Sequence, residues 1–203
     1  IATALQFEAD RNGAFMITKA MYPESTTSPD SEAKYVAQSI NNAINAGDKV
    51  AVLIPERGNM IRRVGPLLAY HGVNVRTTKL LGLSGWNDPA VWREPSLKDA
   101  WFVSTSPEDE NAFRARYERL YGRAPSSLAS VAYDAAAMAF QIIGDGVVDQ
   151  SEFTDKNGFR GVNGLFRFRV DGTAERRLPI LEVSGSGARV VQPAAATFTP
   201  GIG

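Results

Sequence analysis

Residues 49–88 have the sequence KVAVLIPERGNMIRRVGPLLAYHGVNVRTTKLLGLSGWND. The stretch opens with the apolar run Val50–Ile54, which shows no polar alternation, so both faces of this predicted strand must be covered, as in a parallel sheet. Apolar residues at helical spacing within residues 60–68 predict a crossover helix. A second apolar run, Lys79–Leu83, predicts the neighbouring parallel strand and completes a right-handed βαβ unit. The stretch therefore predicts an α/β fold, a parallel sheet with helices on both faces.

The candidate ligand site lies in the two loops that follow these strands. Ligands of parallel α/β sheets bind beyond the carboxyl ends of the strands, so these two loops are expected to face a ligand. No catalytic residue, metal ligand or cofactor is predicted. The predicted ligand-binding residues are Glu56, Arg57, Ser84, Trp86, Asn87 and Asp88, together with Tyr22 at the end of a further predicted strand.

Composition excludes several classes of function. The 203 residues carry 22 Lys and Arg against 22 Asp and Glu, so no net charge favours nucleic acid or an anionic membrane as a partner. There is no cysteine, which excludes disulfides, thiolate catalysis and cysteine-based zinc sites. The longest apolar stretches, Val131–Ile143 and Val50–Ile54, are too short or too interrupted to form a transmembrane segment.

Catalytic signatures are sparse. The single histidine, His71, precedes Gly72 at the end of the predicted helix, where a cation interacts favourably with the helix dipole, so a structural role is predicted. Glycine-rich phosphate loops and nucleophile-elbow motifs are absent from the sequence. Hydrolysis by Glu56 and Asp88 is an alternative, but carboxylates in such loops more often cap helices or face solvent. The sequence therefore predicts a protein that is not an enzyme.

Three side chains in or after these two loops each have two interpretations. Trp86 and Trp92 can form the wall of a ligand cleft, or they can pin the loop onto the sheet. Trp86 is the favoured ligand contact because it directly follows the strand. Arg57 can hold a ligand carboxylate, or it can pair with Glu56 in solvent, which is the favoured interpretation.

The remaining chain continues the α/β pattern and ends differently. Hydrophobic spacing predicts helices at residues 1–12, 28–46, 107–121 and 126–143, and strands at Ala14–Tyr22 and Ala100–Ser104.

The helix from residue 126 is expected to bury Leu128, Val131 and Ile142, among others. Gly164–Val170 and Arg176–Val183 flank Asp171-Gly172, which predicts an antiparallel C-terminal β-hairpin with a two-residue turn. One further strand is predicted at Arg189–Val191.

A series of motifs along the chain resembles a known family. The motifs are Val50 to Pro55-Glu56 with the helix Met60–Leu68, Leu80-Leu81-Gly82 and its loop, Trp101-Phe102-Val103, Phe113-x-x-x-Tyr117-x-x-x-Tyr121-Gly122, Ala132-Tyr133-Asp134-Ala135-Ala136, and Gly161-Val162-Asn163-Gly164-Leu165-Phe166-Arg167-Phe168 with Asp171-Gly172. In this order they resemble the type I periplasmic solute-binding proteins of the leucine/isoleucine/valine-binding kind, whose lobes are Rossmann-like. The loop Leu81-Gly82-x-x-Gly85-Trp86-Asn87-Asp88-Pro89 and the helix end Leu67-Leu68-Ala69-Tyr70-x-Gly72 are most similar to the penicillin-binding protein activator sub-branch.

The resemblance implies two α/β lobes joined by three hinge crossings, with the ligand between the lobes. Residues 1–98 would form the second-lobe α/β domain, 99–158 helices associated with the first lobe, and 159–203 a hinge-crossing β-hairpin and tail. The opening βα units of the first lobe have no counterpart, and the start at Ile1 predicts a processed or truncated product. The implied location is the periplasm, either free or lipid-anchored facing it.

The resemblance implies two alternative functions. The first is the substrate-binding component of an ABC transporter for amino acids or similar small solutes, with the transporter permease as partner. The second is a penicillin-binding protein activator-type regulator, with a peptidoglycan synthase as partner. Amino-acid-binding relatives hold the ligand's ammonium group with an acidic residue where this chain has Ser84, so Asp88 would have to replace it. An aromatic residue of those relatives is replaced by Leu53 or Ile54.

Overall fold

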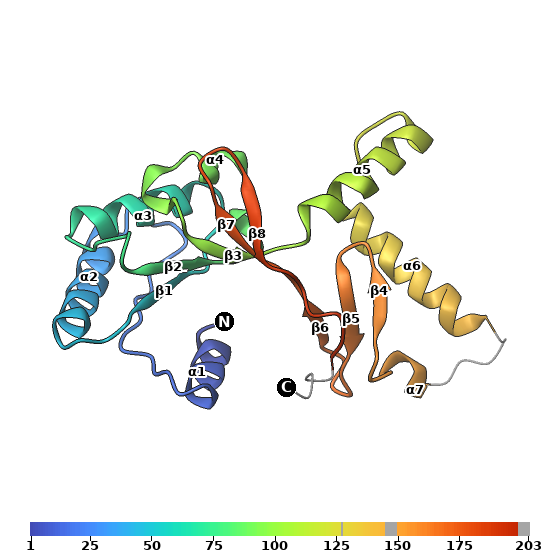
Figure 1. The fold of residues 1–203 in the computed structure, drawn as a ribbon, viewed down its shortest axis with the longest axis horizontal. Helices are drawn as coiled ribbons and strands as arrows, with labels where there is room; N and C mark the ends of the chain where they lie inside the picture. Colours follow the sequence, from blue (N-terminus) through green and yellow to red (C-terminus); the bar gives the residue numbers. More distant parts are fainter. Residues whose placement is uncertain (127, 145–149, 199–203) are drawn as a thin grey trace. The chain divides into compact units, whose positions relative to one another are not determined.

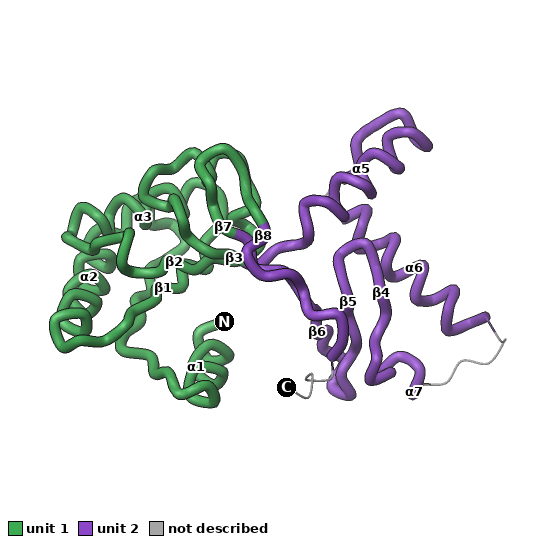
Figure 2. The backbone as a smooth tube through the Cα atoms, viewed as in Figure 1, with its two compact units in different colours: residues 1–102, 182–189 green, residues 103–181, 190–203 purple. Residues whose placement is uncertain are grey.

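A computed structural model describes residues 1–126, 128–144 and 150–198. The chain divides into two compact units, which Figure 2 shows in different colours. Unit 1 contains Ile1–Phe102 and Glu182–Arg189, and unit 2 contains Val103–Leu181 and Val190–Gly203. The chain therefore passes from one unit to the other at three points along the sequence.

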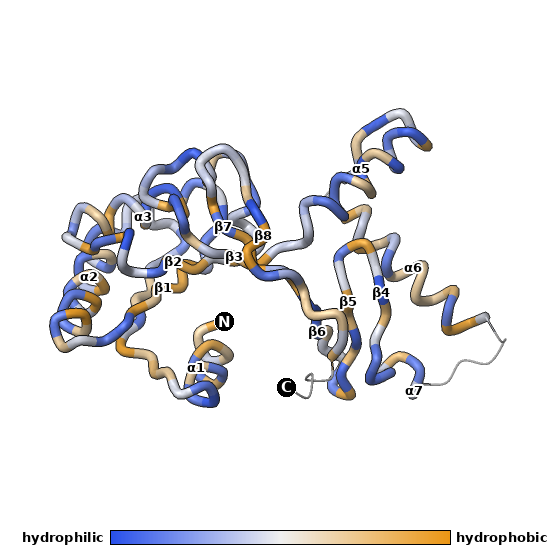
Figure 3. Tube along the Cα trace, in the orientation of Figure 1, coloured by the Kyte–Doolittle hydropathy of each residue, from blue (hydrophilic) through white to orange (hydrophobic). Residues whose placement is uncertain are grey.

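The described residues of unit 1 centre on a largely parallel sheet. Its five strands have the order β1 (Ala51–Ile54), β2 (Lys79–Gly82), β3 (Trp101–Val103), β7 (Ile180–Val183) and β8 (Ala188–Gln192) (Figure 1). β1 and β3 both run parallel to β2, with Ile54 opposite Gly82 and Gly82 opposite Phe102. β1 is hydrophobic throughout, as Figure 3 shows. The predicted α/β fold and its βαβ unit are confirmed.

Helices that connect the strands of unit 1 pack together and bury apolar side chains. The connection from β1 to β2 contains η1 (Gly58–Met60) and α3 (Ile61–Tyr70), and α2 (Asp30–Asn45) packs against α3. α3 also approaches η3 (Pro95–Leu97) so closely that a Cβ atom on Gly65 would lie 2.7 Å from Leu97 Cδ2. The largest buried apolar side chains of unit 1 include Ile40, Ile54, Ile61, Leu68, Leu80, Leu97, Phe102 and Val183.

The first segment of the chain differs from the prediction. The helix is present as α1 (Ala2–Arg11), although it has no buried residue. The predicted strand Ala14–Tyr22 is wrong, because within the described chain no backbone hydrogen bond joins residues 15–22 to another segment. Exposure nevertheless alternates along these residues, as in a strand. The pattern therefore predicted the extended backbone correctly. It wrongly predicted that this backbone pairs with a neighbouring strand.

Unit 2 combines helices with a small antiparallel sheet. α5 (Pro107–Tyr121) begins at Ser106, whose Oγ accepts a hydrogen bond from Asp109 N, and ends at Gly122 in the left-handed conformation. α6 (Ala129–Ile143) and α7 (Gln150–Phe153) follow. The described residues of the sheet form β4 (Phe159–Gly161), β5 (Gly164–Phe168) and β6 (Ala174–Arg177), in that order.

The predicted hairpin is present with two corrections. Its loop has three residues, Val170–Gly172, closed by a hydrogen bond from Arg169 N to Thr173 O, because Gly172 adopts a positive φ of 80° that adds a bulge to the turn. The returning strand ends at Arg177, and Ile180–Val183 pairs in the other sheet as β7. Pro179 lies between β6 and β7, and because proline has no backbone N–H it cannot donate the hydrogen bond that would continue the strand. The predicted strand at Arg189–Val191 is confirmed within β8.

The burial expected for α6 is largely wrong. Leu128 and Val131 are 71% and 46% exposed, and the buried residues of the helix are Asp134 and Ile142. Ile142 packs with Phe159 and Phe166 of the small sheet. The spacing predicted an apolar stripe, but in the described chain only its C-terminal end has a covering partner.

Candidate functional site

The two predicted site loops lie in contact. β1 and β2 are parallel and in register, so their carboxyl ends lie at one edge of the sheet. A Cβ atom on Gly85 would lie 3.1 Å from Arg57 Cγ and 3.3 Å from Glu56 O, so the loop after β2 touches the loop after β1 at a glycine. We call this edge, residues 55–58 and 83–88, the β1–β2 rim.

Trp86 lies in the core beneath the rim rather than on its surface. Its side chain is 0% exposed, and its Nε1 donates a hydrogen bond of 3.1 Å to Ile54 O. The indole lies directly over Gly82, where a Cβ atom would come within 2.2 Å of the ring. Of the two interpretations, pinning the loop onto the sheet describes the observed contacts, and the indole offers a ligand no accessible surface in this structure.

Trp92 and Asp88 stabilise the same loop. Trp92 Nε1 donates to Trp86 O at 3.0 Å. Asp88 is the N-cap of the short helix α4 (Pro89–Trp92), and its Oδ1 accepts from Ala90 N at 2.6 Å. The Asp88 carboxylate was expected to replace the acidic residue of amino-acid-binding relatives. In the structure it caps this helix instead.

Tyr22 and Glu56 form a part-buried polar contact at the rim. The Tyr22 hydroxyl donates to Glu56 Oε1 at 2.6 Å, and both residues are half-buried. Burial raises the pKa of Tyr22 well above its usual value, and the hydrogen bond to Glu56 and the charges of Glu56 and Glu32 raise it further. The phenol therefore remains a neutral hydrogen-bond donor to the Glu56 side chain. The structure thus brings Tyr22 to the rim although its segment forms no strand.

The remaining predicted residues are more accessible. Ser84 and Arg57 are exposed, and Asn87 is half-buried. Within the part of the chain that the structure describes, no ion pair joins Arg57 to Glu56, so the expected pairing of these two residues is not observed.

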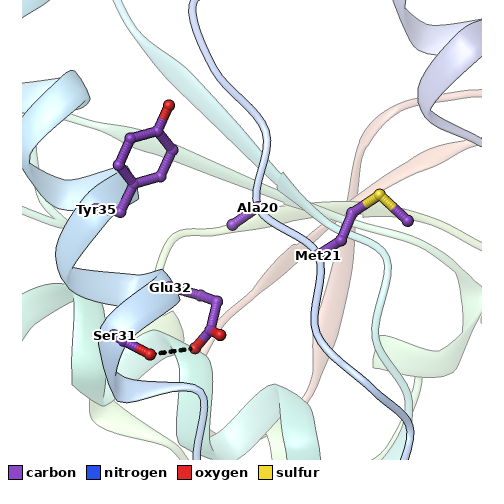
Figure 4. Close-up of a pocket in the computed structure, with 5 residues that line it drawn as sticks. All are labelled: Ala20, Met21, Ser31, Glu32 and Tyr35. Carbon is purple, nitrogen blue, oxygen red and sulfur yellow. Dashed lines mark hydrogen bonds between the residues drawn. The ribbon is translucent and has the colours of Figure 1, made fainter.

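A shallow depression of about 270 Å³ lies between the extended segment before Pro23 and the start of α2. It is lined by Ala20, Met21, Ser31, Glu32 and Tyr35 (Figure 4). The first two belong to the extended segment, and the other three to the first turns of α2. Ser31 Oγ donates to Glu32 Oε2 at 2.9 Å. Sequence reasoning missed this depression, because it depends on the path of the extended segment past α2.

Neither a metal site nor a membrane span is found in the described ranges. No group of three or more His, Asp or Glu side chains is placed to hold a metal ion. No helix is long and apolar enough to cross a membrane. His71 ends α3 and lies 2.8 Å from Asp30 at the start of α2, so its contacts are structural.

No family model and no curated protein matches the chain. A protein of Rhodospirillum rubrum assigned to a branched-chain amino acid ABC transporter has a TM-score of 0.74, at 18% identity over 94% of this chain and 56% of its own. A branched-chain amino acid ABC transporter periplasmic ligand-binding protein of Burkholderia xenovorans has a TM-score of 0.68, at 14% identity, with coverages of 98% and 56%. The chain has the type I periplasmic binding protein fold.

A third neighbour extends the range of ligands. It is an ABC transporter solute-binding protein of R. palustris in complex with benzoate, with a TM-score of 0.59, 14% identity, and coverages of 98% and 57%. The chain spans a little over half the length of these solved structures. At such identities the likeness shows the fold, and neither transport nor the activator sub-branch follows from it.

Proposed function

We propose that this chain is a non-enzymatic binding module that holds a small solute for an ABC transporter. The observation that carries the proposal is the contact of the two rim loops at the carboxyl edge of β1 and β2, with the half-buried Tyr22–Glu56 pair beside it. Ligands of open α/β sheets bind at this kind of edge. The fold shared with solute-binding proteins supports the same site.

The proposed ligand class is a small organic solute. The neighbours that support it are named for branched-chain amino acids or contain benzoate. The proposed binding residues are Tyr22, Glu56, Arg57, Ser84 and Asn87, with Asp88 and Trp86 shaping the loop from within. Binding without chemical change agrees with a rim whose two candidate carboxylates are engaged by a phenol and by a helix cap.

The proposed setting is extracytoplasmic, with a transporter permease as partner. The alternative setting is regulation of a peptidoglycan synthase, suggested by the Gly85-Trp86-Asn87-Asp88 loop. In the structure, Trp86 and Asp88 of this loop make packing and capping contacts within the chain. These contacts explain the residues of the loop without a protein partner. We therefore favour solute binding.

A thermal-shift screen tests the proposal. Leucine, isoleucine and benzoate should be added separately to the 203-residue chain at rising concentration. A ligand that binds only the folded state raises the melting temperature by mass action, and a free-ligand concentration of 100 times the Kd contributes about 2.7 kcal/mol. A regulator that acts through protein contacts would give no response to any of these solutes.

A blocking substitution locates the site. Ser84→Tyr adds bulk at an exposed rim position and should abolish the response, whereas Ser126→Tyr adds the same bulk at an exposed position of unit 2 and should leave it unchanged. An equal response in both variants, or no response of the parent chain to any solute, would contradict the proposal.

A further inference from the structure

The helix α6 has an apolar stripe on a different side from its contacts with the small sheet. On the sheet side, Ile142 packs with Phe159 and Phe166, and the buried Asp134 accepts hydrogen bonds from the turn between β4 and β5. Apolar residues that recur every three or four positions share another side of the helix, and they are exposed or half-buried. We call them the α6 stripe, which consists of Leu128, Ala132, Ala136, Ala139, Phe140 and Ile143.

The large side chains of the α6 stripe are highly accessible. Leu128, Phe140 and Ile143 are 71%, 80% and 55% exposed. The 15 residues of α6 make a helix about 22 Å long, so the stripe is a continuous surface rather than a few scattered side chains. Continuous exposed apolar surface marks a site of interaction. The α6 stripe is therefore a surface that suits a partner.

The charge of this surface narrows the choice of partner. Asp134 is the only charged residue of α6, and it is buried. Helices that lie on anionic lipid carry Lys and Arg, which α6 lacks, so a membrane surface is disfavoured. The 22 basic and 22 acidic residues of the chain cancel, so no net charge opposes the approach of two copies. The charges therefore favour an apolar, uncharged partner and permit a second copy of this chain.

The α6 stripe also has the same pattern of sizes from either end. Leu128 lies at one end, Phe140 and Ile143 lie at the other, and only alanines lie between them. A two-fold interface requires such a self-complementary surface, because each contact between two different positions occurs twice. An antiparallel pair of α6 helices centred on Ala136 places Leu128 opposite Ile143 of the second copy. The alanines then face one another, and the helix axes can approach closely.

We propose that the α6 stripe is the two-fold interface of a homodimer, in which α6 packs antiparallel against α6 of a second copy of this chain. A stripe about 22 Å long on a helix about 10 Å wide is small beside the roughly 800 Å² that each partner of a standard interface buries. The dimer is therefore weak, with a Kd on the order of 10–100 µM. It is independent of the proposed solute binding, because α6 belongs to unit 2 and the β1–β2 rim to unit 1.

Sedimentation equilibrium of the 203-residue chain, at concentrations on both sides of this Kd, measures the association. The mass should rise from 22.0 kDa toward twice that value. Ala136→Arg places two like charges face to face and should weaken the dimer about tenfold or more, a difference of about 1.4 kcal/mol.

Ala137→Arg is the matched control. Ala136 and Ala137 are both exposed, but Ala137 lies on a different side of α6, so its substitution should leave the Kd unchanged. Arginine is a good helix former, and both variants should fold. Circular dichroism melting of each variant checks this.

The absence of cysteine from the chain allows a test of the pairing itself. The two-fold axis brings position 136 of the two copies together, so the single-cysteine variant Ala136→Cys should form a disulfide-linked dimer under mild oxidation. Ala137→Cys should cross-link much more slowly, because its thiols point away from the second copy.

Three outcomes would contradict the proposal. A chain that stays monomeric at every concentration would overturn it and leave the α6 stripe to a different partner, such as polypeptide outside these 203 residues. Association that is equally strong in Ala136→Arg and Ala137→Arg would overturn it by showing that the copies pair through another surface. Equal rates of cross-linking in the two cysteine variants would overturn the antiparallel pairing centred on Ala136.

Discussion

The indole N–H of Trp86 donates a hydrogen bond to the backbone carbonyl of Ile54 at 3.1 Å. Ile54 is the last residue of β1, and Trp86 lies in the loop after β2, so one buried contact joins the ends of two neighbouring strands. Buried polar groups need such partners, and here the partner also fixes the distance between the two rim loops. The geometry of the proposed site therefore depends on a side chain that the ligand does not touch.

Substitution of Trp86 should separate stability from binding. Trp86→Ala should destabilise unit 1 by about 3–5 kcal/mol because it leaves a large cavity. Trp86→Phe keeps most of the packing but leaves the Ile54 carbonyl without its donor, at a cost of about 1–3 kcal/mol. Urea unfolding followed by circular dichroism measures both. If Trp86 were a direct ligand contact, folded Trp86→Phe would lose its thermal-shift response, whereas we expect the response to remain.

Gly82 should tolerate a methyl group only when the indole is removed. Gly82→Ala places a Cβ atom about 2.2 Å from the Trp86 ring, which should cost about 1–3 kcal/mol through overpacking. The same change in a Trp86→Ala background should cost much less. A double-mutant cycle of unfolding free energies measures this coupling, and simple additivity of the two changes would show that the ring does not occupy this position.

Asp134 should stabilise the turn between β4 and β5. Its buried carboxylate accepts hydrogen bonds from Val162 N at 2.6 Å and from Asn163 N at 3.1 Å. Asp134→Ala leaves both donors unpaired and should destabilise unit 2 by about 2–4 kcal/mol. Amide hydrogen exchange at Val162 and Asn163 is the measurement, with Asp134→Asn as the milder control that retains one acceptor. Unchanged protection in the alanine variant would contradict this role.

Glu182 should make the stability of unit 1 depend on pH. The hydrogen bond from Trp101 Nε1 to the Glu182 carboxylate lowers the pKa of Glu182, and Arg189 lowers it further. A lowered pKa contributes stability that is present above the unfolded value of about 4.3 and is lost as pH falls through the folded value.

Glu182→Gln should therefore be less stable than the parent chain at pH 7, by about 1–2 kcal/mol, and the difference should shrink toward pH 3. All three tryptophans lie in unit 1, so their fluorescence during urea unfolding reports its stability. A difference that stays constant from pH 7 to pH 3 would mean that the carboxylate titrates alike in the folded and unfolded states.

The sequence predicted those parts of the fold in which local pattern and tertiary partner agree. The run Val50–Ile54 predicted a covered parallel strand, and β1 is parallel to β2 and apolar throughout. The helix predicted at residues 107–121 is present as α5 with the same bounds, between the N-cap Ser106 and the left-handed Gly122. These signals depend on a few neighbouring residues.

Predictions that needed a distant partner were less successful. Residues 15–22 have the alternation of a strand but form no backbone hydrogen bonds with another strand of the described chain. Val131 has the spacing of a core residue but is exposed. The position of Trp86 after a strand predicted a ligand contact. Instead the ring packs in the core, because Gly82 has no side chain and leaves room for it. The Tyr22–Glu56 hydrogen bond joins residues 34 positions apart, a distance over which no local pattern gives a signal.

Mapping of ligand-induced amide shifts tests the central claim most directly. The 203-residue chain, labelled with ¹⁵N, should be titrated with the solute that gives the largest thermal shift. We predict that the amides of residues 54–58 and 83–88 and of Tyr22 shift together with one Kd, and that the solute is recovered unchanged. Shifts confined to unit 2, or conversion of the solute to a product, would contradict the account.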